Sequence, residues 1–444
     1  MRQQFLKTFL FSLILICLSN QKSFSRTFVS EVDRQVSLSN SVLEMKIDIV
    51  QGEFSIKDKK LDLIVFEKAR FSADGWDSNN FNIQWHKKKI ERNGKNGMAV
   101  ELLLSTKEGK VLPEYKFAFT LLDDASWIEF RTGLKNTLSY DCRFMEGMLF
   151  SDARLFPEKI LSDIRTLNGA AGYTNAEVCA DSSRISENSM LLTGLVNGQR
   201  YSIVWGGLCY DSFYAVTKYN KENRTIELGM RDPVGRLVRQ GQDWWASDSY
   251  YLGLGESNPF VALENYGTEL REANHADPNL YDYPTLCGWA VGNLSKGEDI
   301  NTSVALVDEL DAANQSGLTK YTKVAIRLEP DFYCYKDGNT EQGWWDDAHW
   351  RQYGHLVRPY DTFEKWCKTI RDKNGIPFTY FQCSMPSDDF AKAHPEWMLR
   401  QDISKLHLFH RHHQPYVRYD YTNKEFQKHM KSVWSRLHKD GMGG

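Results

Sequence analysis

The chain has 444 residues, of which 41% are hydrophobic and 25% charged, and its formal net charge is −3. This composition excludes disordered and fibrous proteins and favours roughly two or three globular domains. Charges of both signs are interspersed and no long run of Lys or Arg occurs, so we expect no nucleic-acid partner. Aromatic residues make up 13%, which is typical of large β-sheet cores and also of sugar-stacking surfaces.

Residues 1–25 have the pattern of a secretory signal peptide. Basic residues precede the apolar run 9–18, and Ser23 and Ser25 supply small side chains before a cleavage site. We therefore expect export to the periplasm or the extracellular space. Cys17 follows the bulky Ile16, which disfavours a lipoprotein anchor, and no other segment is long and apolar enough for a membrane span.

Residues 26–256 predict a β-sandwich domain. Short runs of alternating apolar and polar residues, bounded by Gly, Asn and Asp, are typical of all-β folds. The clearest hairpin covers 192–205, with Asn197-Gly198 at its turn, because these residues accept the positive φ angles of a type I′ turn. Other predicted strands lie within 41–56, 97–104, 115–122 and 126–134.

Residues 257–282 predict a helix that links two domains. Asn258 suits the N-cap, and Pro259 suits the first turn of a helix that extends to Ala276. Its apolar face would consist of Phe260, Leu263 and Leu270.

Residues 283–444 predict the first three βα units of a (β/α)8 TIM barrel. Three strand-like runs alternate with three amphipathic helical patterns, which is typical of βαβ units. A complete barrel takes about 250 residues, so this region would form an incomplete one, ending at 441–444 where a fourth strand would begin. The strands are expected at 285–291, 324–328 and 377–383, and the helices at 300–313, 360–373 and 423–439.

The candidate binding residues follow the second and third predicted barrel strands. Barrel enzymes build their sites at the carboxyl ends of the strands, so position is the main argument. An aromatic ring beside a carboxylate suits a sugar, because the C–H face of the sugar stacks on the ring and its hydroxyls donate to the carboxylate. The alternative is a solvated acidic loop with its Trp residues packed underneath. The candidates are Glu329, Asp331, Trp345, Asp346 and Asp388, with Trp344, Asp347, His349 and Trp350 close to them in the sequence.

Other polar clusters have simpler explanations. One carboxylate of Asp388-Asp389 is expected to cap the following short helix, while the other stays open as a ligand. The histidines in 406–413 fit no HExxH spacing and have no partnering cysteines, so we expect a solvated loop rather than a metal site. The cysteines that remain after Cys17 form no CxxC pair, which indicates neither a zinc site nor a disulfide scaffold, and several of them fall inside apolar runs, where we expect buried small hydrophobes.

Several segments together resemble glycoside hydrolase family 36 and its clan, the α-galactosidases and related retaining α-glycosidases. The resemblance implies an N-terminal β-supersandwich, a TIM-barrel catalytic domain, an oligosaccharide or polysaccharide substrate, and no cofactor. The segments are the hairpin 192–198, the interdomain helix 257–273, the first-strand motif Cys287-Gly288-Trp289, the third-strand segment 381–399, and 419–423 leading into 426–437.

The chain departs from the family after the second predicted barrel strand. Family members usually have Asp-Asp-Gly-Trp there, whereas this chain has Leu328-Glu329-Pro330-Asp331-Phe332, which puts galactose specificity in question. Glu329 and Asp331 are the nearest equivalents of the sugar-binding acidic pair. The family mechanism is double displacement with retention, with a nucleophilic Asp on the fourth strand and an acid/base Asp on the sixth.

By this alignment both catalytic carboxylates lie beyond Gly444, and no catalytic residue is assigned. Asp420 precedes a predicted helix and fits a turn or a cap better than a nucleophile. The sequence therefore favours an inactive, truncated piece of an exported α-galactosidase-like enzyme. The alternative is a non-catalytic, secreted glycan-binding protein, and a purely structural β-sandwich protein would leave the Trp and Asp loops unexplained.

Overall fold

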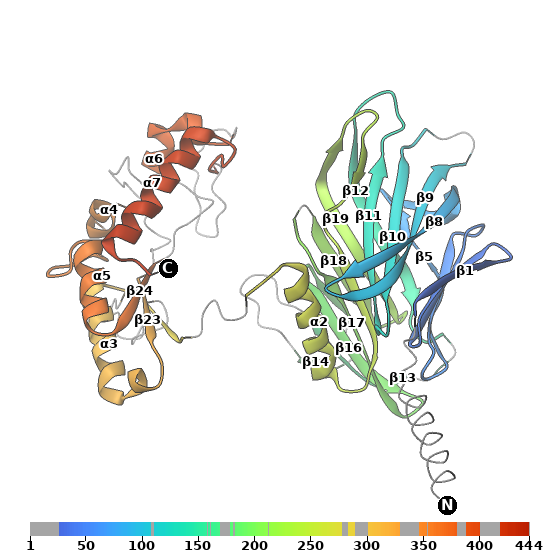
Figure 1. Ribbon diagram of the computed structural model, residues 1–444, viewed down its shortest axis with the longest axis horizontal. Coiled ribbons are helices and arrows are strands. Elements are labelled where there is room, and N and C mark those ends of the chain that lie inside the picture. Colours follow the sequence, from blue (N-terminus) through green and yellow to red (C-terminus); the bar gives the residue numbers. More distant parts are fainter. Residues whose placement is uncertain are drawn as a thin grey trace, which may run out of the picture. The chain divides into compact units, whose positions relative to one another are not determined.

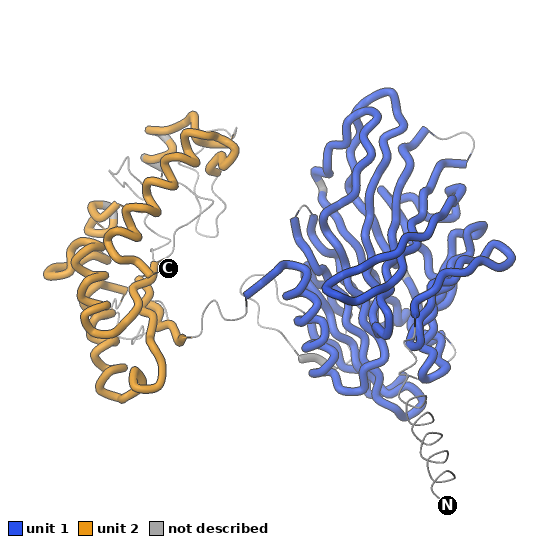
Figure 2. Tube along the Cα trace, viewed as in Figure 1, with its two compact units in different colours: residues 1–277 blue, residues 278–444 orange. Residues whose placement is uncertain are grey.

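The computed structural model forms two compact units, residues 1–277 and residues 278–444 (Figure 2). The structure describes residues 26–107, 111–157, 159, 161–168, 178–180, 183–211, 213–277, 283–288, 301–328, 346–352, 354–379, 388–399 and 418–443. The predicted signal peptide and Cys17 lie outside these ranges, as does the histidine-rich segment 406–413.

The first unit consists mainly of antiparallel strands arranged in three sheets (Figure 1). A five-stranded sheet at its N-terminal end has the order β1-β2-β3-β4-β5. Its strands are β1 (Phe28–Val32), β2 (Gln35–Ser39), β3 (Leu43–Asp48), β4 (Glu53–Asp58) and β5 (Leu63–Arg70).

The largest sheet has ten strands in the order β14-β13-β16-β17-β21-β11-β10-β9-β8, and β20 pairs with β11. Its strands are β8 (Phe81–Arg92), β9 (Lys95–Thr106), β10 (Glu114–Leu122), β11 (Trp127–Lys135), β13 (Leu161–Asn168), β14 (Val178–Ala180), β16 (Ser189–Val196), β17 (Gln199–Gly207), β20 (Asp243–Trp245) and β21 (Tyr250–Glu256). A six-stranded sheet has the order β15-β18-β19-β12-β6-β7. It is made of β6 (Ser72–Ala73), β7 (Trp76–Asp77), β12 (Cys142–Arg154), β15 (Arg184–Ser186), β18 (Tyr214–Asn220) and β19 (Thr225–Val238), and the short 3-10 helix η1 (Ser78–Asn80) follows β7.

The three sheets share one hydrophobic core. Alternate residues of each strand point inward, so the apolar members of the sequence pattern meet between the sheets. The centre is rich in phenylalanine, with the ring centroids of Phe66 and Phe150 4.5 Å apart and those of Phe54 and Phe150 5.3 Å apart. Trp205 is fully buried, and its Nε1–H donates to the carbonyl oxygen of Glu227 at 3.1 Å. Aromatic residues of this unit are therefore mostly core residues.

The predicted hairpin is present as β16 and β17. Asn197 and Gly198 have φ angles of 51° and 83°, the left-handed values that a type I′ turn requires. Val196 pairs with Gln199, so the turn has two residues and fixes the register of both strands. The local sequence was enough to predict this turn.

The helix α2 (Pro259–Ala273) follows the last strand of the first unit. The side chain of Asn258 accepts the backbone N–H of Phe260, and Pro259 occupies the first turn, as the sequence predicts. Ala262 and Tyr266 pack on the ten-stranded sheet, and the Tyr266 hydroxyl donates to the carbonyl oxygen of Gly207 at 2.6 Å. The prediction that Phe260 lies on the apolar face is wrong, because its side chain is 74% exposed.

The second unit contains a three-stranded parallel sheet with the order β22-β23-β24. Helical segments alternate with these strands, as the sequence predicts. The strands are β22 (Thr285–Cys287), β23 (Val324–Leu328) and β24 (Gly375–Thr379). The helices are α3 (Ser303–Ser316), α4 (Asp347–Gln352), α5 (Phe363–Asp372), α6 (Asp388–Ala393) and α7 (Lys424–Asp440), with short 3-10 helices η3 (Leu318–Lys320) and η4 (Pro395–Trp397).

Side-chain caps define the long helices of the second unit. Thr302, Thr362 and Asn423 each accept a backbone N–H in the first turn of α3, α5 and α7. Gly317 and Gly441 end α3 and α7 with positive φ angles of 81° and 102°, where glycine carries no Cβ penalty. These signals are local, which is why the helices were predictable.

The buried face of α7 differs from the predicted one. The apolar spacing of the sequence predicts Trp434 on the same stripe as Phe426, Met430, Val433 and Leu437, but the Trp434 side chain is 56% exposed. The residues that α7 buries recur at three- and four-residue spacing and pack in the core of the unit; they are Phe426, Met430, Val433 and Leu437. After α7, the Gly443 N–H donates to the carbonyl oxygen of Pro377 at 2.8 Å, so the chain reaches the edge of β24.

Candidate functional site

The carboxyl ends of β23 and β24 are the structural origin of the candidate site. The two strands pair in parallel register, and the Thr379 hydroxyl donates to the carbonyl oxygen of Leu328 at 3.0 Å. Both strands therefore end at the same edge of the sheet. The segments that leave this edge, 329–345 and 380–387, lie outside the described residues.

Four of the five predicted binding side chains fall in parts that the structure does not describe. Glu329, Asp331 and Trp345 lie outside the described residues, and Asp388 is the first residue of α6 but its side chain is not described. Asp346 is described: its Oδ1 accepts the N–H of Ala348 at 2.8 Å. Asp346 thus caps α4, and the sugar-binding roles of all five remain predictions.

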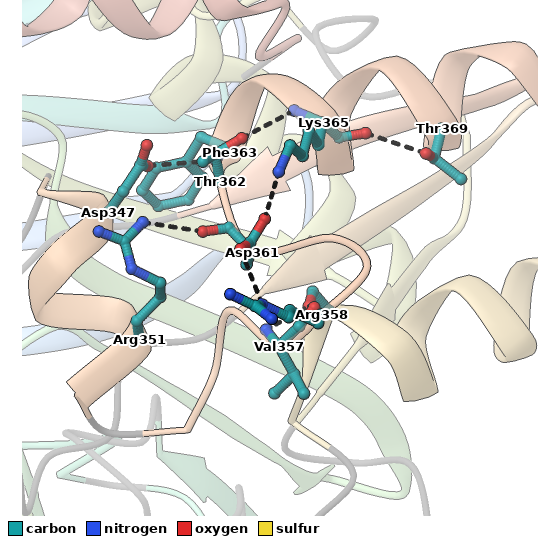
Figure 3. A network of polar contacts seen from close by, with 10 residues as sticks. Asp347, Arg351, Val357, Arg358, Asp361, Thr362, Phe363, Lys365 and Thr369 are labelled. Atoms are coloured by element: carbon teal, nitrogen blue, oxygen red, sulfur yellow. Dashed lines mark hydrogen bonds and ion pairs between the residues drawn. The ribbon is translucent and has the colours of Figure 1, made fainter.

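Asp347 anchors α4 to the start of α5 (Figure 3). Its Oδ1 accepts the backbone N–H of Phe363 at 3.1 Å, and the Arg436 guanidinium lies 3.8 Å away. Burial raises the pKa of the Asp347 carboxyl above its ordinary value, although the Phe363 N–H and Arg436 favour the ionised form. A carboxylate bound in this way holds α4 at the start of α5, which favours a structural role for Asp347 over a role in sugar binding.

A second carboxylate completes the network of Figure 3. Asp361 accepts from the Lys365 ammonium at 2.6 Å, and Arg351 donates to the Asp361 carbonyl oxygen at 3.0 Å. The hydrogen bond from Lys365 holds the pKa of the Asp361 carboxyl below its usual range. Asp347 and Arg351 therefore join α4 to the segment that leads into α5.

Trp350 is a core residue rather than a sugar platform. Its side chain is 1% exposed and packs edge-on against Phe363, with ring centroids 5.3 Å apart. The buried His355 ring lies 5.5 Å from the Trp350 ring and forms a 2.8 Å hydrogen bond through Nδ1 with the carbonyl oxygen of Asn301. Of the two explanations for the high aromatic content, core packing rather than sugar stacking applies to Trp350.

The residues around η4 are also structural. The His394 ring stacks on Trp397 with centroids 4.0 Å apart and an interplanar angle of 7°. Trp397 in turn packs against Phe426 of α7. Asp420 accepts the N–H and the hydroxyl of Thr422 at 2.9 and 2.6 Å, which confirms that it stabilises a turn.

A layer of side chains that crosses the three strands is not predicted by the sequence pattern. Cys287, Arg327 and Phe378 are neighbours in the parallel register. An Arg327 Nη2–H donates to Cys287 Sγ at 3.4 Å, and the Tyr283 ring lies 5.9 Å from the ring of Phe378. A positive charge inside the apolar run 324–328 was the signal that could have revealed it.

Among the described residues, no group of three or more His, Cys, Asp or Glu side chains could hold a metal ion. Of the helices that the structure describes, none is both long and apolar enough to cross a membrane.

Comparison with solved structures identifies the fold. The galactosidase domain of the α-galactosidase–sucrose kinase AgaSK matches with a TM-score of 0.58 and 11% identity, covering 94% of this chain and 65% of that one. A variant of the family 36 α-galactosidase AgaA from Geobacillus stearothermophilus, solved with stachyose, matches with a TM-score of 0.52 and 9% identity, covering 94% of this chain and 64% of that one. The α-N-acetylgalactosaminidase NagBb from Bifidobacterium bifidum, solved with GalNAc, matches with a TM-score of 0.51 and 8% identity, covering 91% and 68%.

Sequence-based comparison finds no such match. No protein-family model matches the chain, and no curated protein matches at a significant level. The chain spans about 65% of the AgaSK galactosidase domain to which it is similar. Over more than nine-tenths of its length, the chain has the fold of the corresponding part of the glycoside hydrolase family 36 α-galactosidases.

Proposed function

We propose that the protein is an exported, α-galactosidase-like glycoside hydrolase that acts by double displacement with retention. The observation that carries the proposal is the coverage of 94% of this chain by the galactosidase domain of AgaSK. The parallel strands β22, β23 and β24, with helices packed on one face, agree with the opening of a (β/α)8 barrel. An oligosaccharide or polysaccharide would then bind where β23 and β24 end.

The reaction needs two carboxyl groups about 5 to 5.5 Å apart, one as nucleophile and one as acid and base. We propose that neither is among the described carboxylates of this chain, because the family's nucleophile and acid/base lie on the fourth and sixth barrel strands. The described carboxylates support this proposal, because Asp347, Asp361 and Asp420 each bind backbone or side-chain groups of their own unit.

The binding residues would lie in the loops after β23 and β24. We propose Glu329 and Asp331 as the acidic pair that binds the sugar, with Trp345, Asp346 and Asp388 beside them. The replacement of the family's Asp-Asp-Gly-Trp by Glu329-Pro330-Asp331-Phe332 leaves galactose, N-acetylgalactosamine and glucose as candidate sugars.

Hydrolysis by the product of the complete reading frame tests this function. The substrates are the p-nitrophenyl α-glycosides of galactose, N-acetylgalactosamine and glucose, and proton NMR of the first product identifies its anomer. We expect cleavage of one substrate with release of the α-anomer, since retention preserves configuration. Release of the β-anomer would contradict the mechanism, and absence of cleavage with all three would contradict the activity.

Matched variants separate binding from folding. Asp331→Asn is expected to lower kcat/KM by about 10- to 100-fold, since a charged hydrogen bond contributes about 1.5 to 3 kcal/mol. Asp346→Asn keeps an oxygen for the Ala348 N–H, so a loss of activity at unchanged thermal stability would assign Asp346 to the sugar. Glycan binding without turnover by the full product would favour the alternative, a secreted glycan-binding protein.

A further inference from the structure

The ten-stranded sheet of the first unit has an outer face that points away from the hydrophobic core. Phe117 and Phe119 of β10 pack in the core, so Lys116 and Ala118 lie on the outer face, because side chains alternate along a strand. The helix α2 packs on this face near Trp127 of β11. The neighbouring strands β8, β9, β10 and β11 form a continuous surface on this side of the sheet (Figure 1).

Trp245 of β20 lies on this face with its ring in a fixed position. Its backbone pairs with Gly133 of β11, and a Cβ at Gly133 would lie 2.9 Å from the Trp245 ring, so the ring packs over a position without a side chain. The Lys116 ammonium lies 4.3 Å from the ring centroid and is paired with Asp243. Because Lys116 is buried, this cation–π contact holds the ring in place.

Arg131 is held beside the same ring. Its Nε–H donates to the carbonyl oxygen of Ala246, and its Cζ lies 5.7 Å from the Trp245 ring centroid. Arg131 is exposed, and among the described residues no carboxylate pairs with its guanidinium. Its two terminal nitrogens therefore remain for a ligand, and their N–H groups form a rigid fork that matches a carboxylate or a sulfate.

The carboxylates around Arg131 are already bound to other basic side chains. Glu101 binds His86, Glu129 binds Arg92, and Asp243 binds Lys116. The register places Arg131 in one row across the strands with Glu101, and Lys88 of β8 in the next row. Lys88 is exposed and, like Arg131, has no carboxylate partner among the described residues. Two cations of this face are thus available to an external anion.

We propose that this face binds an acidic polysaccharide, with a carboxylate or sulfate group on Arg131 and a second anionic group on Lys88. The strands β9 and β10 separate the two cations, which places them about 15 Å apart. A small anion reaches one of them, whereas a chain of charged sugars meets both. The partly exposed Trp245 would contact the sugar whose anion binds Arg131.

This site is additional to the sugar site proposed at β23 and β24, and the choice of a glycan among polyanions rests on the proposed function. A nucleic acid is disfavoured, because every nucleotide carries a charge and tight binding requires many cations along the backbone.

Calorimetric titration of the full chain tests the proposal without turnover. The probes are an oligogalacturonate, a sulfated galactan oligosaccharide and a neutral galactan oligosaccharide, each long enough to span about 15 Å. We expect one acidic probe to bind about 10-fold or more tightly than the neutral probe, and the two acidic probes distinguish carboxylate from sulfate. Binding and hydrolysis are measured separately, so either can fail alone.

Variants assign the binding to the outer face. Arg131→Gln should weaken binding of the acidic probe by about 10-fold, and Lys88→Gln by about 2- to 5-fold, because an exposed lysine contributes less. Lys87→Gln is the matched control, since Lys87 is the neighbouring residue of β8, points to the other face of the sheet and should not affect binding. If Arg131→Gln lowers the melting temperature, the comparison of Lys88→Gln with Lys87→Gln decides.

Three results would overturn the proposal. The first is a neutral probe that binds as tightly as both acidic probes. The second is an equal weakening in Lys87→Gln and Lys88→Gln, because the attraction would then depend on total charge and not on this face. The third is polyuridylate that binds more tightly than both acidic probes, which would make this face a nucleic-acid surface.

Discussion

The two units bury their sheets in different ways. In the first unit the apolar faces of antiparallel sheets meet in one core, where Phe54, Phe66 and Phe150 pack ring on ring. In the second unit helices cover one face of a parallel sheet, and the other face includes the half-buried Arg327. The difference teaches that the first unit fills the space between its sheets with apolar side chains, whereas the sheet of the second unit has a charged side chain on one of its faces.

The largest expected effects come from the buried tryptophans of each unit. Trp205→Ala and Trp366→Ala should each lower the free energy of unfolding of their own unit by about 3 to 5 kcal/mol, because both side chains are fully buried. Denaturant titration measures the unfolding transitions, and limited proteolysis at each denaturant concentration shows which unit has unfolded. Trp434→Ala, at a side chain that is 56% exposed, is the control and should cost less than about 1 kcal/mol.

Replacing each tryptophan by phenylalanine compares the contribution of the indole N–H to the stability of the two units. Trp205→Phe removes the donor to the Glu227 carbonyl oxygen, whereas Trp366 Nε1 has no acceptor among the described residues. Trp205→Phe should therefore destabilise more than Trp366→Phe, since it breaks a buried hydrogen bond. Equal losses would mean that volume alone decides the stability of both cores.

Asp74 should have an intermediate effect in the first unit. Its carboxylate accepts the N–H groups of Met145 and Glu146 at 2.8 and 2.9 Å and the Tyr115 hydroxyl at 3.0 Å. Asp74→Ala removes the two oxygens that accept these three hydrogen bonds and should cost about 2 to 4 kcal/mol. Asp74→Asn keeps one oxygen for the two N–H groups and tolerates the φ of 47°, so it should cost less.

The same residue predicts a pH dependence. Burial raises the pKa of the Asp74 carboxyl, so the folded state binds its proton more tightly than the unfolded state. The contribution of Asp74 to stability is then full below the ordinary pKa of an aspartate and falls as pH rises through the raised value. Unfolding of the first unit at several pH values should show this slope, and Asp74→Asn should remove it. An unchanged slope in the variant would assign the pH dependence to other groups.

The smallest expected effect is at the cap of α5 in the second unit. The Thr362 hydroxyl accepts the N–H of Lys365 at 3.2 Å, and Thr362→Ala should lower the stability of this unit by about 1 kcal/mol. Thr362→Ser keeps the hydroxyl and serves as the control. A melting temperature that is equally lowered in both variants would point to the threonine methyl group instead of the cap.

Sequence reasoning succeeded where the signal was local. The Asn197-Gly198 turn, the Asn258 cap and the strand 324–328 each depend on backbone preferences within a few residues. The helical spacing of apolar residues was less reliable for predicting the burial of single side chains. Phe260 of α2 and Trp434 of α7 fit an apolar stripe but are exposed. Helical spacing shows which residues share a face, but the partner surface decides how much of that face is covered.

The sequence by itself determined the order of strands and helices and the family resemblance, because both are written in short motifs and their spacing. The tertiary structure decided which residues meet. Arg327 and Cys287 are 40 positions apart in the chain and become neighbours only through parallel pairing of β22 with β23. Trp350 became a core residue through packing on Phe363, and Asp347 became an anchor for α5. Parallel register and side-chain packing are long-range properties, so no local pattern could have predicted these contacts.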